Sequence, residues 1–331
     1  MQGKFALSSA VLLLSLIGCG SASRQNSALA PDSEPAAALL AHPEITHVFV
    51  VVLENAGYAE AIGNAAMPYL NGLAGQGSLA TNYYAVTHPS IGNYEMMTAG
   101  QVITNNDGFT GTIAVDNVVR HLVANGMTWK GYAQSIPSAG YVGPDVYPYA
   151  QRHNPLSYFS DVRDTPAQRA NLVPLTELAA DMSAGSLPNY AMIVPDLNHD
   201  GHDCPVGRSS CTLTDKLAAA DEFLQQTAAP LLADADFLAH GVLIVVFDEG
   251  MDTDSAHGGG HVSTVLAGAR IRAGYESAEL YQHQNLARFT LEALGLTSFP
   301  GQGETAASMR EFLIPEIRLH PSPRKPPNPR H

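Results

Sequence analysis

The sequence predicts an α/β protein with a doubly wound, mostly parallel central sheet and helices on both of its faces. Apolar runs at 47–53, 190–196 and 241–250 are typical of strands that are buried on both sides. Stretches with helical periodicity separate these runs, and strands that alternate with helices pair in parallel through crossovers. With 331 residues, 45% of them hydrophobic, the chain can form one large core.

The other predicted elements complete the alternation along the chain. A helix over 67–77 closes on glycines, and a helix over 112–126 has Gly126 as its C-cap. Residues 128–135 are predicted to form a further strand. The long helix predicted at 215–234 separates two of the apolar strands. The remaining predicted elements are a helix begun by SIGNYEMMT, a short strand in VSTVLAGARI and a last helix over 285–296.

The two ends of the chain differ in composition from its body. Residues 1–18 have one lysine followed by an apolar run too short to span a membrane, which predicts a signal peptide. The following Cys19 completes a stretch that resembles a bacterial lipobox. Residues 19–44 are rich in Ser, Ala and Pro, a composition that predicts a flexible tether. A folded domain is expected over 45–315, and a Pro-rich, disordered tail over 316–331.

These ends predict an exported protein. A lipid on Cys19 would anchor it to a membrane as a cell-envelope lipoprotein, in the periplasm or at the cell surface. The alternative is an ordinary secretory signal in which Cys19 is cleaved away. In an exported protein the neighbouring Cys204 and Cys211 are expected to form a disulfide, with a Cys–His metal site as the alternative.

The charge of the chain limits the classes of function. A net charge of −14 argues against a nucleic-acid-binding protein, which would present a basic face. An anionic substrate is still compatible, because bound cations reverse the field around a site. The chain has 13 histidines, and imidazole is the commonest metal ligand. The oligomeric state is left open.

Carboxylates and imidazoles follow three of the predicted strands. The carboxyl ends of parallel strands share one rim of a sheet, so these side chains are expected to converge there. Crowded carboxylates repel one another, and a divalent cation relieves that repulsion. Taken singly, each group could instead be a helix N-cap, a solvated turn or a flexible glycine loop. The residues are Glu54, Asn55, Asp196, His199, Asp200, His202, Asp203, Asp248, Glu249, His257 and His261.

A candidate nucleophile lies in the stretch AVTHPSIGNYEMMTAG at 85–100. Thr87 precedes a turn of small residues from which a helix can start. A hydroxyl at a helix N-terminus beside a cation is activated by the metal, and the backbone N–H groups there hold a phosphate. The alternative is that Thr87 or Ser90 only caps that helix.

At these residues the chain resembles the bacterial phosphoesterase family of the alkaline phosphatase superfamily. The resemblance covers roughly 46–298 and lies in the order of the motifs: Glu-Asn after the first strand, T-x-P-S, P-[DN]-x-x-x-D-x-H-D, D-E-G, and a His before the last helix. Within that family the chain is most similar to secreted acid phosphatases that act on phosphatidylinositol 3-phosphate. It is more distantly similar to phospholipases C.

The resemblance implies roles for individual residues. Thr87 would be the nucleophile, with Ser90 as the second candidate. His202 or His283 would donate a proton to the leaving group. The residues that would bind one cation are Glu54, Asn55, Thr87, Asp248 and Glu249. A further set, Asp196, Asp200, His202 and His261, would bind a second metal or phosphate, and His153 in RHNP matches a further element that contacts phosphate.

The chain departs from the superfamily at two acidic positions. Glu54 and Glu249 stand where many members have Asp and His, which favours oxygen-rich ligation of one Mg²⁺, Mn²⁺ or Ca²⁺ over two tight Zn²⁺ sites. His257 has no counterpart in the pattern. Residues 134–172 are expected to form a long loop over the site that sets specificity, or else plain surface packing.

The implied function is that of a metal-dependent phosphomonoesterase, acid-phosphatase-like, that forms a phosphothreonine. Its substrate would be a small phosphate ester or a phospholipid head group, with phosphoinositides among the candidates. The first alternative is a phosphodiesterase or phospholipase C-like enzyme. The second is a metal-binding lipoprotein without turnover, against which the T-x-P-S turn argues because a pure binder needs no nucleophile.

Overall fold

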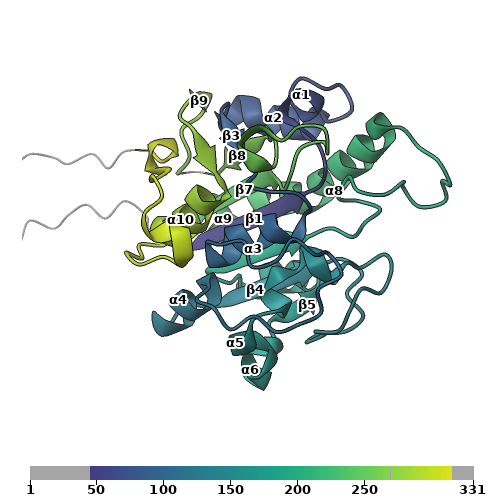
Figure 1. Ribbon diagram of the computed structural model, residues 1–331. Coiled ribbons are helices and arrows are strands. Elements are labelled where there is room, and N and C mark those ends of the chain that lie inside the picture. The colour runs from purple at the N-terminus through teal and green to yellow at the C-terminus, as the bar shows by residue number, and fades with distance from the viewer. Residues whose placement is uncertain (1–44, 269, 315–331) are drawn as a thin grey trace, which may run out of the picture. The chain divides into compact units, whose positions relative to one another are not determined.

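The computed structural model describes residues 45–268 and 270–314 (Figure 1). The predicted signal peptide, the tether and the Pro-rich tail lie outside these residues, and so does Cys19. The predicted boundaries of the folded domain therefore remain predictions.

An eight-stranded sheet forms the centre of the described residues, in the order β5-β4-β6-β1-β7-β8-β2-β9. The five strands from β5 to β7 pair in parallel, and β8 runs antiparallel to both of its neighbours, β7 and β2. The prediction of a mostly parallel sheet is confirmed. The strands are β1 His47–Leu53, β2 Ser78–Ala80, β4 Trp129–Ala133, β5 Leu172–Pro174, β6 Tyr190–Val194, β7 Gly241–Phe247, β8 Thr264–Ala267 and β9 Tyr275–Ser277, with β3 Tyr83–Tyr84 and β10 Tyr281–Gln282 pairing in a separate sheet.

The strand β1 lies between β6 and β7, and all seven of its residues are buried. Its register pairs Val48 with Tyr190 on one side and with Val242 on the other. β-branched side chains pack well on a pleated surface that is covered on both faces, which explains the run of valines. Because the three strands are parallel neighbours, their carboxyl ends lie together at one rim.

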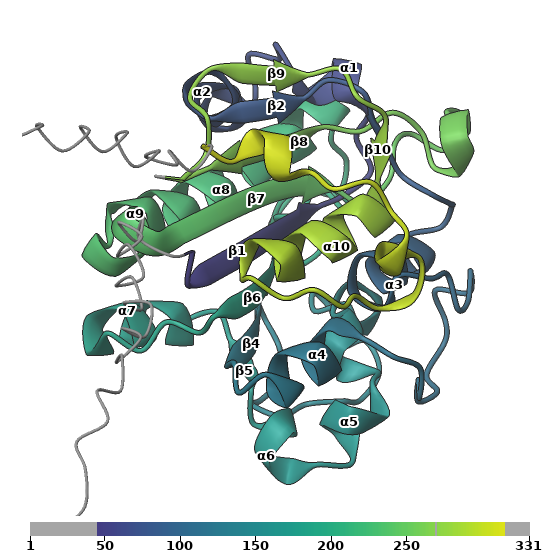
Figure 2. The ribbon, with the colours of Figure 1, turned by 90° about the vertical axis from the view of Figure 1, so that its left-hand side faces the viewer.

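Helices cover both faces of the sheet (Figure 2). The helices α8 and α9 lie on one face, and α10 lies with α3 and α4 on the other. Within the described part of the chain, no helix is both long and apolar enough to cross a membrane. The helices are α1 Tyr58–Ala61, α2 Pro68–Gln76, α3 Ile91–Ala99, α4 Val118–Ala124, α5 Ser160–Arg163, α6 Pro166–Arg169, α7 Glu177–Ala184, α8 Leu213–Ala233, α9 Ala235–His240 and α10 His283–Ala293.

Two predicted segments differ from the structure. The helix predicted at 112–126 begins only at Val118, because the Asn117 side chain caps it by accepting from the Arg120 N–H at 3.2 Å. The segment 134–172 is not a plain loop. It contains α5, α6 and the 3₁₀ turns η1 (Gln151–His153) and η2 (Pro155–Ser157). Further short 3₁₀ turns are η3 Ala256–Gly258, η4 Gly301–Glu304 and η5 Arg310–Phe312.

Candidate active site

Carboxylates from three adjacent strand ends meet at the rim of the sheet. Glu54 follows β1, Asp248 follows β7, and Asp200 lies in the turn after β6. Backbone bonds tie the three ends together: the Glu54 N–H donates to the Asp200 carbonyl at 2.8 Å, and the Asp248 N–H donates to the Leu53 carbonyl at 2.9 Å. All three carboxylate residues have no exposed surface. The convergence predicted from the parallel topology is therefore present for these residues.

Glu54 lies at the centre of this group. Its Oε1 accepts from the Tyr94 hydroxyl at 2.6 Å, and its Oε2 accepts from the Ser90 hydroxyl at 3.0 Å. Burial, together with the neighbouring charges of Asp248 and Asp200, raises the pKa of Glu54 well above its ordinary value. The site therefore favours either a proton or a positive ion at this carboxylate.

Asp248 and Glu249 form the second part of the group. Burial raises the pKa of Asp248 to about 7, and burial followed by repulsion from Asp248 raises the pKa of Glu249 to about 9. The Asp248 Oδ1 accepts from the backbone N–H of Asn55 at 3.2 Å. Asn55 has a φ of 54°, in the left-handed region that asparagine tolerates better than most residues. This backbone conformation lets one residue bond to Asp248 while its amide donates to Glu54 Oε2 at 3.4 Å.

The imidazole of His153 joins Glu54 to Asp200. Its Nε2 lies 3.3 Å from Glu54 Oε1 and its Nδ1 lies 3.2 Å from Asp200 Oδ2. The ring stacks on Tyr94 with centroids 5.2 Å apart, and it is buried. Burial, followed by the positive charge of Arg152, holds the pKa of His153 well below its ordinary value. The structure places His153 between two carboxylates, and its predicted contact with phosphate remains a prediction.

The two hydroxyls of the T-x-P-S turn, those of Thr87 and Ser90, lie in different surroundings. The Ser90 hydroxyl donates to Glu54 Oε2 and lies 3.5 Å from Glu249 Oε1. The Thr87 hydroxyl donates to the His88 carbonyl at 3.1 Å, and the Asn93 side chain bonds both the N–H and the carbonyl of Thr87. The Ser90 hydroxyl, the second candidate, therefore lies at the carboxylates, whereas the Thr87 hydroxyl bonds the backbone of the same turn. The predicted role of Thr87 remains a prediction.

A pocket of about 670 Å³ opens above this group. Ser90, Asn55 and Glu249 line it together with His202, so a ligand in the pocket can contact the hydroxyl, an acid and an imidazole at once. The His202 side chain is about one-third exposed, and its Nδ1 lies 2.8 Å from Asp203 Oδ1. That contact leaves the Nε2 atom of His202 available to a ligand. The predicted place of His202 beside the reacting group is compatible with this geometry.

Three predicted site residues lie elsewhere in the structure. Both oxygens of Asp196 accept hydrogen bonds, from Ser135 Oγ at 2.6 Å and from His199 Nδ1 at 2.6 Å, so both already have partners. His261 stacks on Tyr58 with centroids 4.5 Å apart. The structure places both residues away from the carboxylates of Glu54 and Asp248, and their ligand roles remain predictions.

The third of these residues, His283, is fully buried. Its Nε2 donates to the Asp248 carbonyl at 2.5 Å, and its Nδ1 lies 3.1 Å from the Tyr83 hydroxyl. Burial lowers the pKa of His283 to about 4. It bonds the backbone of Asp248 and is not among the described residues that line the pocket, and its role in proton donation remains a prediction. His257, unplaced by the sequence, is exposed and packs against Tyr84 with centroids 4.2 Å apart.

Two contributors to the site were missed in the sequence. Asn93 fixes the backbone of the T-x-P-S turn, and Tyr94 bonds Glu54. They stand three and four residues after Ser90, on the helix that starts there, so both can reach back to the turn. That spacing is the signal that could have identified them. His88, inside the motif itself, contacts Glu249 Oε2 through its Nδ1 at 3.0 Å.

The donor set fits a hard divalent cation. Asp248 Oδ2 and Asp200 Oδ2 are buried and have no hydrogen-bond partner among the described residues. Such orphaned oxygens within a crowded acidic group are the ligands that Mg²⁺, Mn²⁺ and Ca²⁺ prefer. A different triad, His88, Glu249 and Asp252, brings its ligand atoms within 4.8 Å of one another. Glu249 is the member that this triad shares with the predicted set.

Comparison with known sequences identifies the family of the chain and several relatives. The phosphoesterase family matches residues 64–297. The chain is 28% identical over 285 residues to a phosphatidylinositol-3-phosphatase of Mycobacterium tuberculosis, across 86% of this chain and 88% of that protein. It is 26% identical over 320 residues to an acid phosphatase of Aspergillus fumigatus, across 91% of this chain and 68% of that protein. A probable acid phosphatase of Kluyveromyces lactis is 31% identical over 61% of this chain, and the match spans 47% of that longer protein.

Solved structures show the same fold at low identity. A protein of the alkaline phosphatase superfamily from Vibrio parahaemolyticus matches with a TM-score of 0.56 and 13% identity, over 81% of this chain and 72% of that one. The lipoteichoic acid synthase LtaP of Listeria monocytogenes matches with a TM-score of 0.54 and 12% identity, over 78% and 74%. These likenesses establish the fold of the chain and carry no conclusion about its substrate.

Proposed function

The chain belongs to the phosphoesterase family and is a hydrolase of phosphoric ester bonds; from that premise we propose that it is a metal-dependent phosphomonoesterase of the acid-phosphatase kind, with Ser90 as its nucleophile. The observation that carries the proposal is the Ser90 hydroxyl, which lines the pocket and lies against the carboxylates of Glu54 and Glu249. The names of the curated relatives support a phosphomonoester as substrate, with phosphoinositides among the candidates.

In this proposal Ser90 is the nucleophile, Glu54 accepts its proton, and His202 is the acid and the base. Ser90 Oγ forms a bond to phosphorus while the bond from phosphorus to the ester oxygen breaks, and the hydroxyl proton passes along its hydrogen bond to Glu54. The alcohol that leaves takes a proton from His202, which lines the same pocket. Water then attacks the phosphoserine and gives its proton to His202. The bond from phosphorus to Ser90 Oγ breaks as phosphate departs, and Ser90 Oγ takes its proton back from Glu54 along the same hydrogen bond.

Glu54, Asn55, Asp248 and Glu249 would hold the cation, with Asp200 behind them. A bound divalent cation favours the ionised form of a neighbouring hydroxyl and offsets negative charge on a transferring phosphoryl group. The predicted set of Mg²⁺, Mn²⁺, Ca²⁺ or Zn²⁺ remains the set to be tested. The oxygen-rich donors favour the first three of these ions.

Activity against model substrates tests the function. We expect the EDTA-treated protein to be inactive and an added divalent cation to restore hydrolysis of p-nitrophenyl phosphate, with much slower hydrolysis of bis-p-nitrophenyl phosphate. Faster turnover of the diester would favour the phosphodiesterase alternative, for which the open pocket of about 670 Å³ has room. Unaltered activity after removal of all metal would contradict the metal dependence.

Substitution of the two hydroxyls tests the nucleophile. We expect Ser90→Ala to lower kcat by at least about a hundredfold, as removal of a covalent nucleophile does. Thr87→Ala is the matched control, and we expect its kcat within about tenfold of wild type, because the Thr87 hydroxyl contacts only backbone. Acid-quenched enzyme should contain phosphoserine. If the variants behave in the reverse order and phosphothreonine is recovered, Thr87 is the nucleophile.

A further inference from the structure

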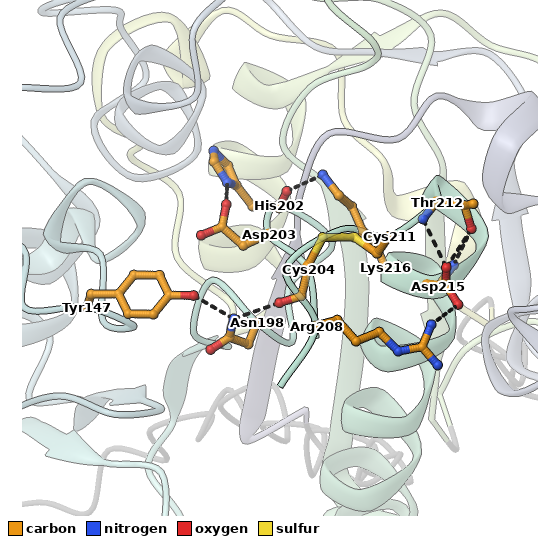
Figure 3. Close-up of a disulfide and its surroundings, with 10 residues drawn as sticks. All are labelled: Tyr147, Asn198, His202, Asp203, Cys204, Arg208, Cys211, Thr212, Asp215 and Lys216. Carbon is orange, nitrogen blue, oxygen red and sulfur yellow. Dashed lines mark hydrogen bonds and ion pairs between the residues drawn. A yellow bond between two sulfur atoms is a disulfide. The ribbon is translucent and has the colours of Figure 1, made fainter. Parts of the chain in front are cut away.

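One wall of the pocket is a short loop closed by a disulfide and fixed to the start of α8. Cys204 and Cys211 are bonded to each other, as predicted, and Cys211 lines the pocket with Leu213 and Lys216. The loop is held in place because the side-chain NH2 group of Asn198 donates one hydrogen bond to the Cys204 carbonyl and one to the Tyr147 hydroxyl, each at 2.8 Å (Figure 3). This wall is therefore a fixed surface of the pocket.

Lys216 is the cation on this wall. Its Nζ donates to the His202 carbonyl at 2.6 Å, and it is half-buried (Figure 3). The nearby carboxylate of Asp215 is already occupied by the Thr212 backbone N–H and by Arg208. No carboxylate forms an ion pair with Lys216 in the part of the chain that the structure describes. Its ammonium group therefore has hydrogen-bonding capacity left for a ligand.

The charge around Lys216 makes this arrangement unusual. Of the described residues that line the pocket, Lys216 is the one lysine or arginine, whereas Asp107, Glu249 and Asp252 are acidic. In a chain with a net charge of −14, an ammonium group that lines a pocket without a paired carboxylate can form an ion pair with an anionic ligand. The phosphate that reacts would lie at Ser90, so Lys216 can bind a second group of the ligand within the same pocket.

We propose that Lys216 binds a second anionic group of the substrate. The preferred substrate is then a phosphate monoester whose alcohol carries a further phosphate or phosphodiester. This inference rests on the proposed function and deepens it. Ser90 and Lys216 both line the pocket of about 670 Å³, so one ligand can contact both residues. The second group can belong to a soluble molecule or to a lipid head group, since both present the same anionic oxygens.

A matched pair of soluble substrates isolates the second anionic group. Inositol 3-phosphate and glycerophosphoinositol 3-phosphate carry the same monoester, and the second compound adds a phosphodiester. We expect the wild-type full chain to have a kcat/KM for glycerophosphoinositol 3-phosphate at least about tenfold above that for inositol 3-phosphate, the scale of a charge-assisted hydrogen bond. Lys216→Met should bring the ratio to about one, and Lys216→Arg should keep most of it.

The control variant is Arg208→Met, which removes a cation from the same loop that is paired with Asp215 and does not line the pocket. Its ratio should equal that of wild type. Hydrolysis of p-nitrophenyl phosphate, which has no second anionic group, should be similar in all variants, and its loss in wild type would refute the proposed function instead. A ratio that survives Lys216→Met, or a wild-type ratio near one, overturns the role of Lys216.

A third substrate distinguishes the two sources of the anion. Phosphatidylinositol 3-phosphate in phosphatidylcholine vesicles presents the same phosphodiester within a lipid surface. Equal sensitivity of the vesicle and soluble diester substrates to Lys216→Met supports recognition of the anionic group itself. Sensitivity confined to the vesicles would show that Lys216 acts on the membrane surface, and the proposal would be overturned. Thermal melting of each variant checks that it is folded.

Discussion

The ring of His153 lies between two carboxylates that come from different strands. A neutral imidazole has one N–H and one lone pair, so it can donate to Glu54 or to Asp200 but not to both. Both ring nitrogens are buried and without a hydrogen bond of good geometry among the described residues. Groups that support metal-binding carboxylates from behind fix their orientation. His153 therefore belongs to the support of the site rather than to its surface.

Replacement of this ring should weaken metal binding. We expect His153→Phe to lower the affinity of the EDTA-treated protein for its activating cation by about 10- to 100-fold, because Glu54 and Asp200 lose their common support. Calorimetric titration with the metal measures the change. The control is His47→Phe, at the opposite end of β1, where a buried imidazole bonds the Pro188 carbonyl at 2.8 Å. Equal losses in both variants would show a general effect on the fold.

At the residue scale, the sequence predicts the acids better than the other groups. Glu54 and Asp248 directly follow buried strands, so topology alone brings them together. The choice between Thr87 and Ser90 depends on the backbone path of the T-x-P-S turn, which no hydrophobic periodicity encodes. His261 and His283 have suitable chemistry for a site, but stacking and burial determine where such rings lie, and these depend on distant residues.

At the scale of elements, a side chain from another helix caps the N-terminus of α2. Its N-cap residue Met67 makes no side-chain cap bond. Instead, Asp221 of α8 accepts from the backbone N–H groups of Tyr69 and Leu70 at 2.9 and 2.8 Å. A carboxylate at a helix N-terminus satisfies free donors and interacts favourably with the helix dipole. Asp221 thus caps α2 and fixes it against α8.

Removal of this carboxylate should destabilise the fold. We expect Asp221→Ala to lower the free energy of unfolding by about 1–2 kcal/mol, the upper range for loss of a cap. Denaturation in urea measures the loss. The neighbouring Glu222 is exposed on the same helix and bonds only Gln226, so Glu222→Ala should change stability by less than about 0.5 kcal/mol. Similar effects of the two substitutions would contradict the capping role.

Elements with a long periodic pattern could be predicted, and short ones could not. The strand predicted at 47–53 has the bounds of β1, and the helix predicted at 215–234 differs from α8 by two residues at its start and by one at its end. The short strands β5 and β9 have three residues each, too few for any period to show. Tertiary pairing at the edges of the sheet determines such segments, and that pairing is not visible in the local sequence.

At the scale of the whole molecule, the site concentrates negative charge in a protein that is already acidic. The net charge is −14, and burial raises the pKa of Asp248 and Asp200 to about 7 and that of Glu249 to about 9. In the unfolded chain these carboxyls ionise near pH 4. Between that pH and the raised values, the metal-free folded state binds more protons than the unfolded state. The contribution of these three carboxyls to stability is therefore fully present below about pH 4 and is lost as the pH rises through about 7 to 9.

A bound cation should reverse that trend, because it takes the place of the protons. We expect the Tm of the EDTA-treated protein to fall from pH 5 to pH 9, and saturating Mg²⁺ or Mn²⁺ to raise the Tm most at pH 8–9. Asp248→Asn removes one buried charge, so it should raise the Tm of the metal-free protein at pH 8 and reduce the gain from metal. Scanning calorimetry across this range measures both effects. A Tm at pH 8–9 that does not change when any of these divalent cations is added would show that the buried carboxyls bind protons and no metal.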